Sequence, residues 1–168
     1  MRGKPVSCCF SGHRTAKLPW GTNERDGRCV LLKARLRAVL EHLIDEGYTH
    51  FICGMADGCD LYCAEAVLEL RARHPALTLE AAIPCLSQAD AWSEAQRARY
   101  RGILARCDVE TLVQETYTRG CMQRRNRYMV DHSAVLVALH GGLPGGTRYT
   151  IEYALRSGLD VIDIPIEG

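Results

Sequence analysis

Four glycines and a proline fall between Gly141 and Gly146, after an apolar segment at residues 134–139 and before a helical pattern that begins at Thr147. A strand, a glycine loop and a helix start, in this order, place unpaired backbone N–H groups and the positive end of a helix dipole at the edge of a sheet. An anion, most often a phosphate, is the natural ligand of such a loop. A tight turn that needs glycine only for its backbone geometry explains the loop equally well.

Two further glycine-containing segments follow apolar segments in the same way. Ser11-Gly12-His13-Arg14 comes after residues 6–10, and Gly54-Met-Ala-Asp-Gly58 comes after residues 48–53. The carboxyl ends of parallel strands meet at one edge of a sheet, so we expect the three segments to converge there, with arginines nearby to hold a phosphate. The expected ligand contacts are Ser11, Gly12, His13, Arg14, Gly54, Met55, Asp57, Gly58, Asp60, Gly145, Gly146 and Thr147.

Several of these side chains have a second explanation. His13 is a phosphate donor or general acid, or else it caps local backbone, and its neighbours favour the ligand role. Asp57 and Asp60 suit ribose hydroxyls, although Asp60 equally suits the cap of a helix that it begins. Glu152 is either a surface carboxylate or one directed at the pocket mouth, and its spacing leaves both open. The basic run at residues 124–127 is by default a solvated helix face.

The elements that must position these residues alternate between strands and helices. Strands are expected at residues 6–10, 48–53, 77–83, 111–113, 134–139 and 161–164, and helices at 29–46, 60–73, 87–106, 120–131 and 147–155. Ser87 is the expected N-cap of the third helix, and the polar residues 15–27 are expected to form a loop. This order predicts an α/β, Rossmann-like fold with a mainly parallel, doubly wound sheet and helices on both faces. Because no linker divides the chain, residues 1–168 are expected to form a single domain.

The composition excludes several classes of protein. Of the 168 residues, 21 are Lys or Arg and 20 are Asp or Glu, and a formal net charge of +1 disfavours a dedicated nucleic-acid binder. No segment, the first residues included, resembles a signal peptide or reaches membrane-spanning length, so a soluble cytoplasmic protein without membrane partners is expected. The nine cysteines include no CxxC pair, which favours buried reduced thiols over a metal site.

The motifs together resemble the YpsA-like family of the SLOG superfamily, which unites the Smf/DprA proteins with the Lonely Guy enzymes. The resemblance rests on Ser11-Gly-His-Arg14, Gly54-Met-Ala-Asp-Gly-Cys-Asp60 with Ala64-Glu65, Gln88 with Trp92, Arg125-Asn126, and Gly145-Gly-Thr147 with Tyr153-Ala154. It covers nearly the whole chain, with its motifs in the expected order. It implies a Rossmann-like fold and a site for a nucleotide or nucleotide-derived ligand, and it adds Asn126 to the expected contacts.

The Lonely Guy enzymes are phosphoribohydrolases that cleave the N-glycosidic bond of nucleoside 5′-monophosphates. Their hallmark is a PGGxGTxxE loop and helix, preceded by an arginine-bearing helix. Residues 144–146 match the start of that motif, Glu152 falls at its final glutamate, and Arg125 falls where the catalytic arginine stands. The resemblance therefore implies Arg125 and Glu152 as catalytic residues, with no metal or cofactor. Arg148 and Tyr149 replace the expected Gly-Thr of the motif. The resemblance therefore supports a shared class of ligand better than it supports a shared catalytic activity.

The preferred hypothesis is a protein that binds a nucleotide or a related phosphorylated nucleoside. Gly145-Gly146-Thr147 and Arg14 would hold the phosphate, and residues 54–58 would pass close to the sugar or base. In an enzyme, Glu152 would stabilise an oxocarbenium-like transition state or activate water, and Arg125 would fix the substrate or assist the leaving group. A non-catalytic nucleotide sensor is the alternative, and DprA-like binding of single-stranded DNA is disfavoured by the charge. The base, the pathway and the oligomeric state, a homodimer included, stay open.

Overall fold

A six-stranded sheet forms the centre of the protein, which we describe from a computed structural model over residues 6–166. Residues 1–5 and 167–168, the two ends of the expected domain, lie outside the described range. The strands are β1 (Ser7–Gly12), β2 (His50–Cys53), β3 (Thr78–Ile83), β4 (Val109–Leu112), β5 (Val135–His140) and β6 (Asp160–Pro165). Their order is β4-β3-β2-β1-β5-β6, and every neighbouring pair is parallel. The predicted α/β, Rossmann-like fold is confirmed.

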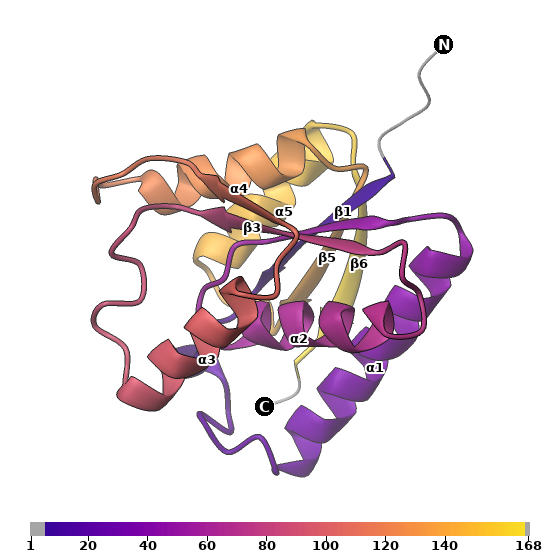
Figure 1. Cartoon of the computed structure of the whole chain (residues 1–168), viewed down its shortest axis with the longest axis horizontal. Helices are drawn as coiled ribbons and strands as arrows, with labels where there is room; N and C mark the ends of the chain where they lie inside the picture. Colours follow the sequence, from indigo (N-terminus) through magenta and orange to yellow (C-terminus); the bar gives the residue numbers. More distant parts are fainter. Residues whose placement is uncertain (1–5, 167–168) are drawn as a thin grey trace.

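Helices cover both faces of this sheet. They are α1 (Gly27–Asp45), α2 (Cys59–Arg71), α3 (Glu94–Leu104), α4 (Cys121–Asp131) and α5 (Gly146–Arg156), with a short 3-10 helix, η1 (Thr15–Lys17), inside the segment predicted to be a loop. Figure 1 shows α1, α2 and α3 on one face and α4 and α5 on the other. No helix within residues 6–166 is both long enough and apolar enough to cross a bilayer.

The central strands are apolar on both faces because helices bury both. Along β1, Cys8 and Phe10 pack in the large core under α1–α3, while Cys9 packs in the smaller core under α4 and α5. Alternate residues of a strand point to opposite faces, so a strand buried on both sides needs a continuous apolar run. Eight of the nine free cysteines are buried, as the sequence predicts: seven lie in the strands or helices, and Cys85 lies just after β3.

The third helix begins later than predicted. Its N-cap is Ser93, whose hydroxyl accepts the N–H of Gln96 at 3.2 Å, and not Ser87. Residues 84–92 form turns instead, because the Gln88 side chain reaches across to the backbone of Gly54. Trp92 therefore precedes the helix and packs edge-on against Tyr100, with 5.3 Å between ring centroids.

The direction of the chain across the sheet reverses beside β1. Strands β1 to β4 proceed outward in one direction, and the chain then returns to place β5 and β6 on the other side of β1. In doubly wound sheets, ligands bind outside the carboxyl ends of the strands at such a reversal. The carboxyl ends of β1 and β5, paired up to Gly12 and Leu139, therefore mark the position to search for a site.

Candidate functional site

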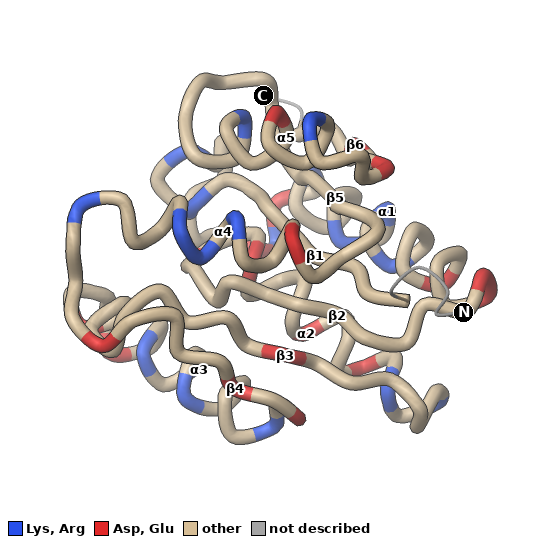
Figure 2. Tube along the Cα trace, turned by 90° about the horizontal axis from the view of Figure 1, so that it is seen from above, with Lys and Arg blue, Asp and Glu red and all other residues tan. Residues whose placement is uncertain are grey.

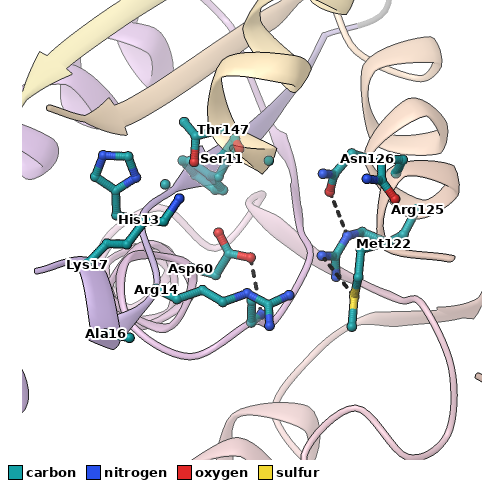
Figure 3. Close-up of a pocket in the computed structure, with 15 residues that line it drawn as sticks. Ser11, His13, Arg14, Ala16, Lys17, Asp60, Met122, Arg125, Asn126 and Thr147 are labelled. Atoms are coloured by element: carbon teal, nitrogen blue, oxygen red, sulfur yellow. Dashed lines mark hydrogen bonds between the residues drawn. The ribbon is translucent and has the colours of Figure 1, made fainter. Parts of the chain in front are cut away.

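A cavity of about 230 Å³ opens at this point of the sheet. Figure 3 shows Arg14, Lys17 and Asp60 on one side of it and Met122, Arg125 and Asn126 of α4 on the other. The wall is completed by the loop after β1 and the first turn of α5. The predicted contacts that the structure brings together here are Ser11, Gly12, His13, Arg14, Asp60, Arg125, Asn126, Gly146 and Thr147.

Arg125 is held inside the protein by neutral partners. Its side chain is buried, its Nε donates to Asn126 Oδ1 at 2.8 Å, and its Nη1 donates to the carbonyl of Gly54 and to Gln88 Oε1. Gln88 Nε2 donates to the same carbonyl at 3.2 Å. Burial lowers the pKa of Arg125, and the negative charge of Asp60 opposes that shift. The guanidinium is thus a fixed cation at the floor of the cavity.

Two of the predicted glycines lie outside the cavity wall and leave space for neighbouring groups to pack closely. A Cβ on Gly54 would lie 2.7 Å from Arg125 Cζ, so only glycine leaves room for the guanidinium. Gly58 has φ 84°, and a Cβ there would lie 2.7 Å from the backbone nitrogen of Thr15. Gly54 therefore admits the Arg125 side chain of α4 beside the segment after β2, and Gly58 lets α2 begin against the loop after β1. Neither glycine is part of the cavity wall.

Met55 and Asp57 also lie outside the wall. Met55 is completely buried in the core and has a positive φ of 59°, which is rare for a residue other than glycine. Its side chain turns away from the ligand position that the sequence suggests. Asp57 is half-buried in the turn before α2 and acts on the cavity only through its charge beside Asp60.

Asp60 is the carboxylate of the cavity. It is 6% exposed, and its Oδ2 accepts the N–H of Ala56 at 3.1 Å. Helix α2 begins at Cys59 with Gly58 at the N-cap, so Asp60 lies inside the first turn and is not the cap. Burial raises the pKa of Asp60, although Arg125, the N–H of Ala56 and Arg14 pull it down.

His13 fastens two of the converging loops to each other. Its Nε2 accepts the backbone N–H of Gly141 at 2.9 Å, which leaves the ring proton on Nδ1 when the imidazole is neutral. Burial, and then the charges of Lys17 and His140, lower the pKa of His13. The backbone-capping explanation is therefore observed for Nε2, while the ring also forms part of the cavity wall.

Lys17 is the principal cavity residue that the sequence analysis missed. It lies at the end of η1, and its Nζ donates to the carbonyl of Pro144 at 2.9 Å, across the glycine loop. Gly145, at φ 141°, leaves room for it, since a Cβ there would lie 2.5 Å from Nζ. The signal was available in the sequence, because Lys17 follows Arg14 by three residues, which is one turn of a 3-10 helix.

Glu152 is not brought to the cavity. Its side chain is 61% exposed and pairs with Arg148 at 3.6 Å, one turn earlier on α5. Arg148 is exposed as well and does not enter the glycine loop, while the hydroxyl of Tyr149 accepts a hydrogen bond from Arg127 at 2.9 Å. Arg125 and Glu152, the two residues that the resemblance implies to be catalytic, thus occupy different surroundings.

The cavity is electropositive. Its charged residues are Arg14, Lys17 and Arg125 against Asp60 alone. Gly146 and Thr147 of α5 also line it, and the N-cap of that helix, Gly145, supplies no side-chain hydrogen bond. The first backbone N–H groups of a helix lack intrahelical partners and carry a partial positive charge. Three cations and an uncapped helix start favour an anionic ligand.

Comparisons with known proteins place this chain among sequences of one family. The model of the YpsA family, described as the YspA SLOG family, matches residues 8–158. The SPbeta prophage-derived protein YoqJ of Bacillus subtilis, itself uncharacterized, is 34% identical over 139 residues, which are 75% of this chain and 81% of that protein. A UPF0398 protein of Halalkalibacterium halodurans is 31% identical over 150 residues, 88% of this chain and 79% of its own.

Two solved structures of DNA processing protein A have a similar fold. The Helicobacter pylori protein, whose structure is described in terms of its single-stranded DNA binding mode, has a TM-score of 0.66 and 17% identity. It aligns with 98% of this chain and 67% of its own. The Streptococcus pneumoniae protein has a TM-score of 0.63 and 16% identity over 96% of this chain and 50% of its own. At these identities the similarity shows the fold alone.

Proposed function

The chain belongs to the YpsA family of SLOG proteins, and from this premise we propose that it binds a nucleotide or a related phosphorylated nucleoside in the cavity beside β1 and β5. The observation that carries the proposal is the coincidence of three cations with an uncapped helix start at the reversal of the strand order. A phosphate suits this combination because backbone N–H groups and cationic side chains contact it together.

The phosphate is assigned to the end of the cavity formed by the first turn of α5. Thr147 supplies a hydroxyl there, Lys17 crosses the preceding loop, and Arg14 lies on the same side of the cavity as Lys17. The buried Asp60 lines the same cavity, where it can accept hydrogen bonds from ribose hydroxyls. A carboxylate repels a phosphate, so we assign the ribose, and not the phosphate, to Asp60.

Calorimetric titration with four nucleoside 5′-monophosphates tests the proposal, with the corresponding nucleosides as controls. We expect the monophosphates to bind and the nucleosides to bind at least about ten-fold more weakly, because they lack the charge-assisted contacts. Lys17→Gln should weaken monophosphate binding about ten-fold and leave nucleoside binding unchanged. Arg25→Gln, an exposed arginine in the following loop, is the matched control. Equal affinity for phosphorylated and unphosphorylated ligands would refute the phosphate assignment.

Hydrolysis of the N-glycosidic bond is a second candidate function, and Asp60 is the observation that favours it. It is the carboxylate in the cavity, and burial raises its pKa above that of an exposed aspartate, which is the direction that favours general acid–base catalysis. In this scheme Asp60, and not the exposed Glu152, assists the water or the ribosyl cation. Release of free base that Asp60→Asn abolishes and Glu152→Gln preserves would support it. Monophosphate binding without base release identifies a nucleotide sensor instead.

A further inference from the structure

A second, open groove of about 540 Å³ lies on the outer side of α4. It runs from the loop that precedes α4, along the helix, to the first turn of α5. Its wall includes Thr118, Arg119, Gln123, Arg124, Arg127 and Tyr149. We call these residues the α4 groove.

Because α4 is a helix, the residues of its basic segment 124–127 face two different sites. Arg125 and Asn126 are buried and face the cavity, whereas Arg124 and Arg127, three residues apart on the helix, lie in the α4 groove. Figure 2 shows the Lys and Arg positions gathered along α4. The run is therefore more than a solvated helix face, because each half of it belongs to a concave surface.

Within residues 6–166, the arginines of the α4 groove have either a neutral hydrogen-bond partner or none. Arg124 donates to Gln114 Oε1 at 3.1 Å and Arg127 donates to the hydroxyl of Tyr149 at 2.9 Å, and both partners are neutral. Arg119 makes no hydrogen bond or ion pair with any residue between 6 and 166. No Asp or Glu contributes to the described wall of the groove. Neutral partners hold two guanidinium groups in place without cancelling their attraction for an anion.

The α4 groove adjoins the cavity, because Gln123 lines both. A ligand that has its first phosphate in the cavity and extends past Gln123 would reach the outer side of α4. The outer side of α4 carries a second cluster of cations, Arg119, Arg124 and Arg127. This arrangement matches a ligand with two phosphate groups that are separated by a nucleoside.

We propose that the α4 groove binds the second phosphate of an extended nucleotide ligand, of the class of 5′-phosphorylated dinucleotides. The proposal rests on the proposed function, since the first phosphate occupies the cavity. A long single-stranded nucleic acid is the competing occupant, and the near-neutral charge of the chain favours the short ligand.

Calorimetric titration with nucleoside 5′-monophosphates and with their 5′-phosphorylated homodinucleotides tests this proposal. We expect each dinucleotide to bind about ten-fold more tightly than its mononucleotide. The slope of log affinity against log salt should be steeper by about 0.7 for the added phosphate. Arg119→Gln should remove most of the gain and leave mononucleotide affinity unchanged. Because Arg119 has no hydrogen-bond or ion-pair partner within residues 6–166, the substitution breaks no such bond there.

Arg124→Gln is a second variant at the α4 groove, and Arg101→Gln on α3, also exposed, is the matched control. Mononucleotide binding with no gain for the dinucleotide, or a gain that both groove variants preserve, would overturn this inference and leave the proposed function intact. Failure of every mononucleotide to bind would overturn the proposed function and this inference with it. Affinity that keeps rising with oligonucleotides of four, eight and twelve residues would identify the α4 groove as a surface for single-stranded nucleic acid and overturn the dinucleotide assignment.

Discussion

Replacing Glu80 by glutamine should remove a large acid-dependent contribution to stability. Glu80 lies on β3, facing α4, and is 6% exposed. It accepts hydrogen bonds from His50 Nε2 at 2.8 Å, from Thr111 Oγ1 at 2.9 Å and from the hydroxyl of Tyr128. Tyr128 belongs to α4, the helix that carries Arg125, so this carboxylate ties one wall of the candidate site to the sheet.

The magnitude follows from the pKa of the carboxyl. Burial would raise the pKa of Glu80, but the hydrogen bonds from His50, Tyr128 and Thr111 outweigh burial and lower it from 4.5 to about 2. At about 1.4 kcal/mol per pKa unit, this difference contributes about 3 kcal/mol to the free energy of unfolding at neutral pH. A carboxyl whose pKa is lower in the folded state than in the unfolded state contributes its full stabilisation at pH values above the unfolded-state pKa. The contribution is therefore lost as the pH falls from about 4.5 towards 2, and about 2 kcal/mol of it is gone by pH 3.

Urea unfolding between pH 7 and pH 3 measures the effect. Glu80→Gln should be less stable than the wild type at pH 7, because the amide accepts at one oxygen and turns an N–H donor towards other donors. The wild type should lose about 2 kcal/mol more than the variant on going to pH 3, so the two profiles converge. Glu110→Gln, at an exposed position on β4, controls for the general loss of negative charge. Parallel profiles for the wild type and Glu80→Gln would refute this account.

Three further substitutions test local features of the fold by the same unfolding measurement. Gly54→Ala should destabilise by about 1–3 kcal/mol, because its Cβ would overlap the buried guanidinium of Arg125, and an unchanged stability would show that the guanidinium moves aside freely. Ser93→Ala should cost about 1 kcal/mol through loss of the α3 N-cap, whereas Ser87→Ala should cost less than half of that, and the opposite order would restore Ser87 as the cap.

The order of strands and helices was predictable because its signals are local. A strand buried on both faces needs a continuous apolar run such as residues 134–139, and a helix on one face of a sheet needs apolar residues at helical spacing. Parallel strands then bring the residues after β1, β2 and β5 to one edge. This is why the order of the elements along the chain suffices to group Ser11, Arg14 and Thr147 at one position.

The start of α3 could not be predicted from local signals. Ser87 and Ser93 are both acceptable caps by residue type, and the choice depends on Gln88, which is drawn to a carbonyl 34 residues away. The direction of individual side chains depends on the same kind of distant contact. Met55 enters the core and Glu152 faces solvent, although both stand in motifs that suggest a ligand.

The sequence by itself determined the fold class and the edge of the sheet at which the residues after β1, β2 and β5 meet. Both depend on periodicity, glycine placement and residue type within short segments. Only the tertiary structure decided which cations reach the cavity, since Lys17 meets the glycine loop across 127 residues of sequence. It also decided that Arg125 and Arg124 serve different surfaces. The reason is physical: backbone periodicity is set by neighbours along the chain, whereas the direction and charge environment of a side chain are set by whatever the fold packs against it.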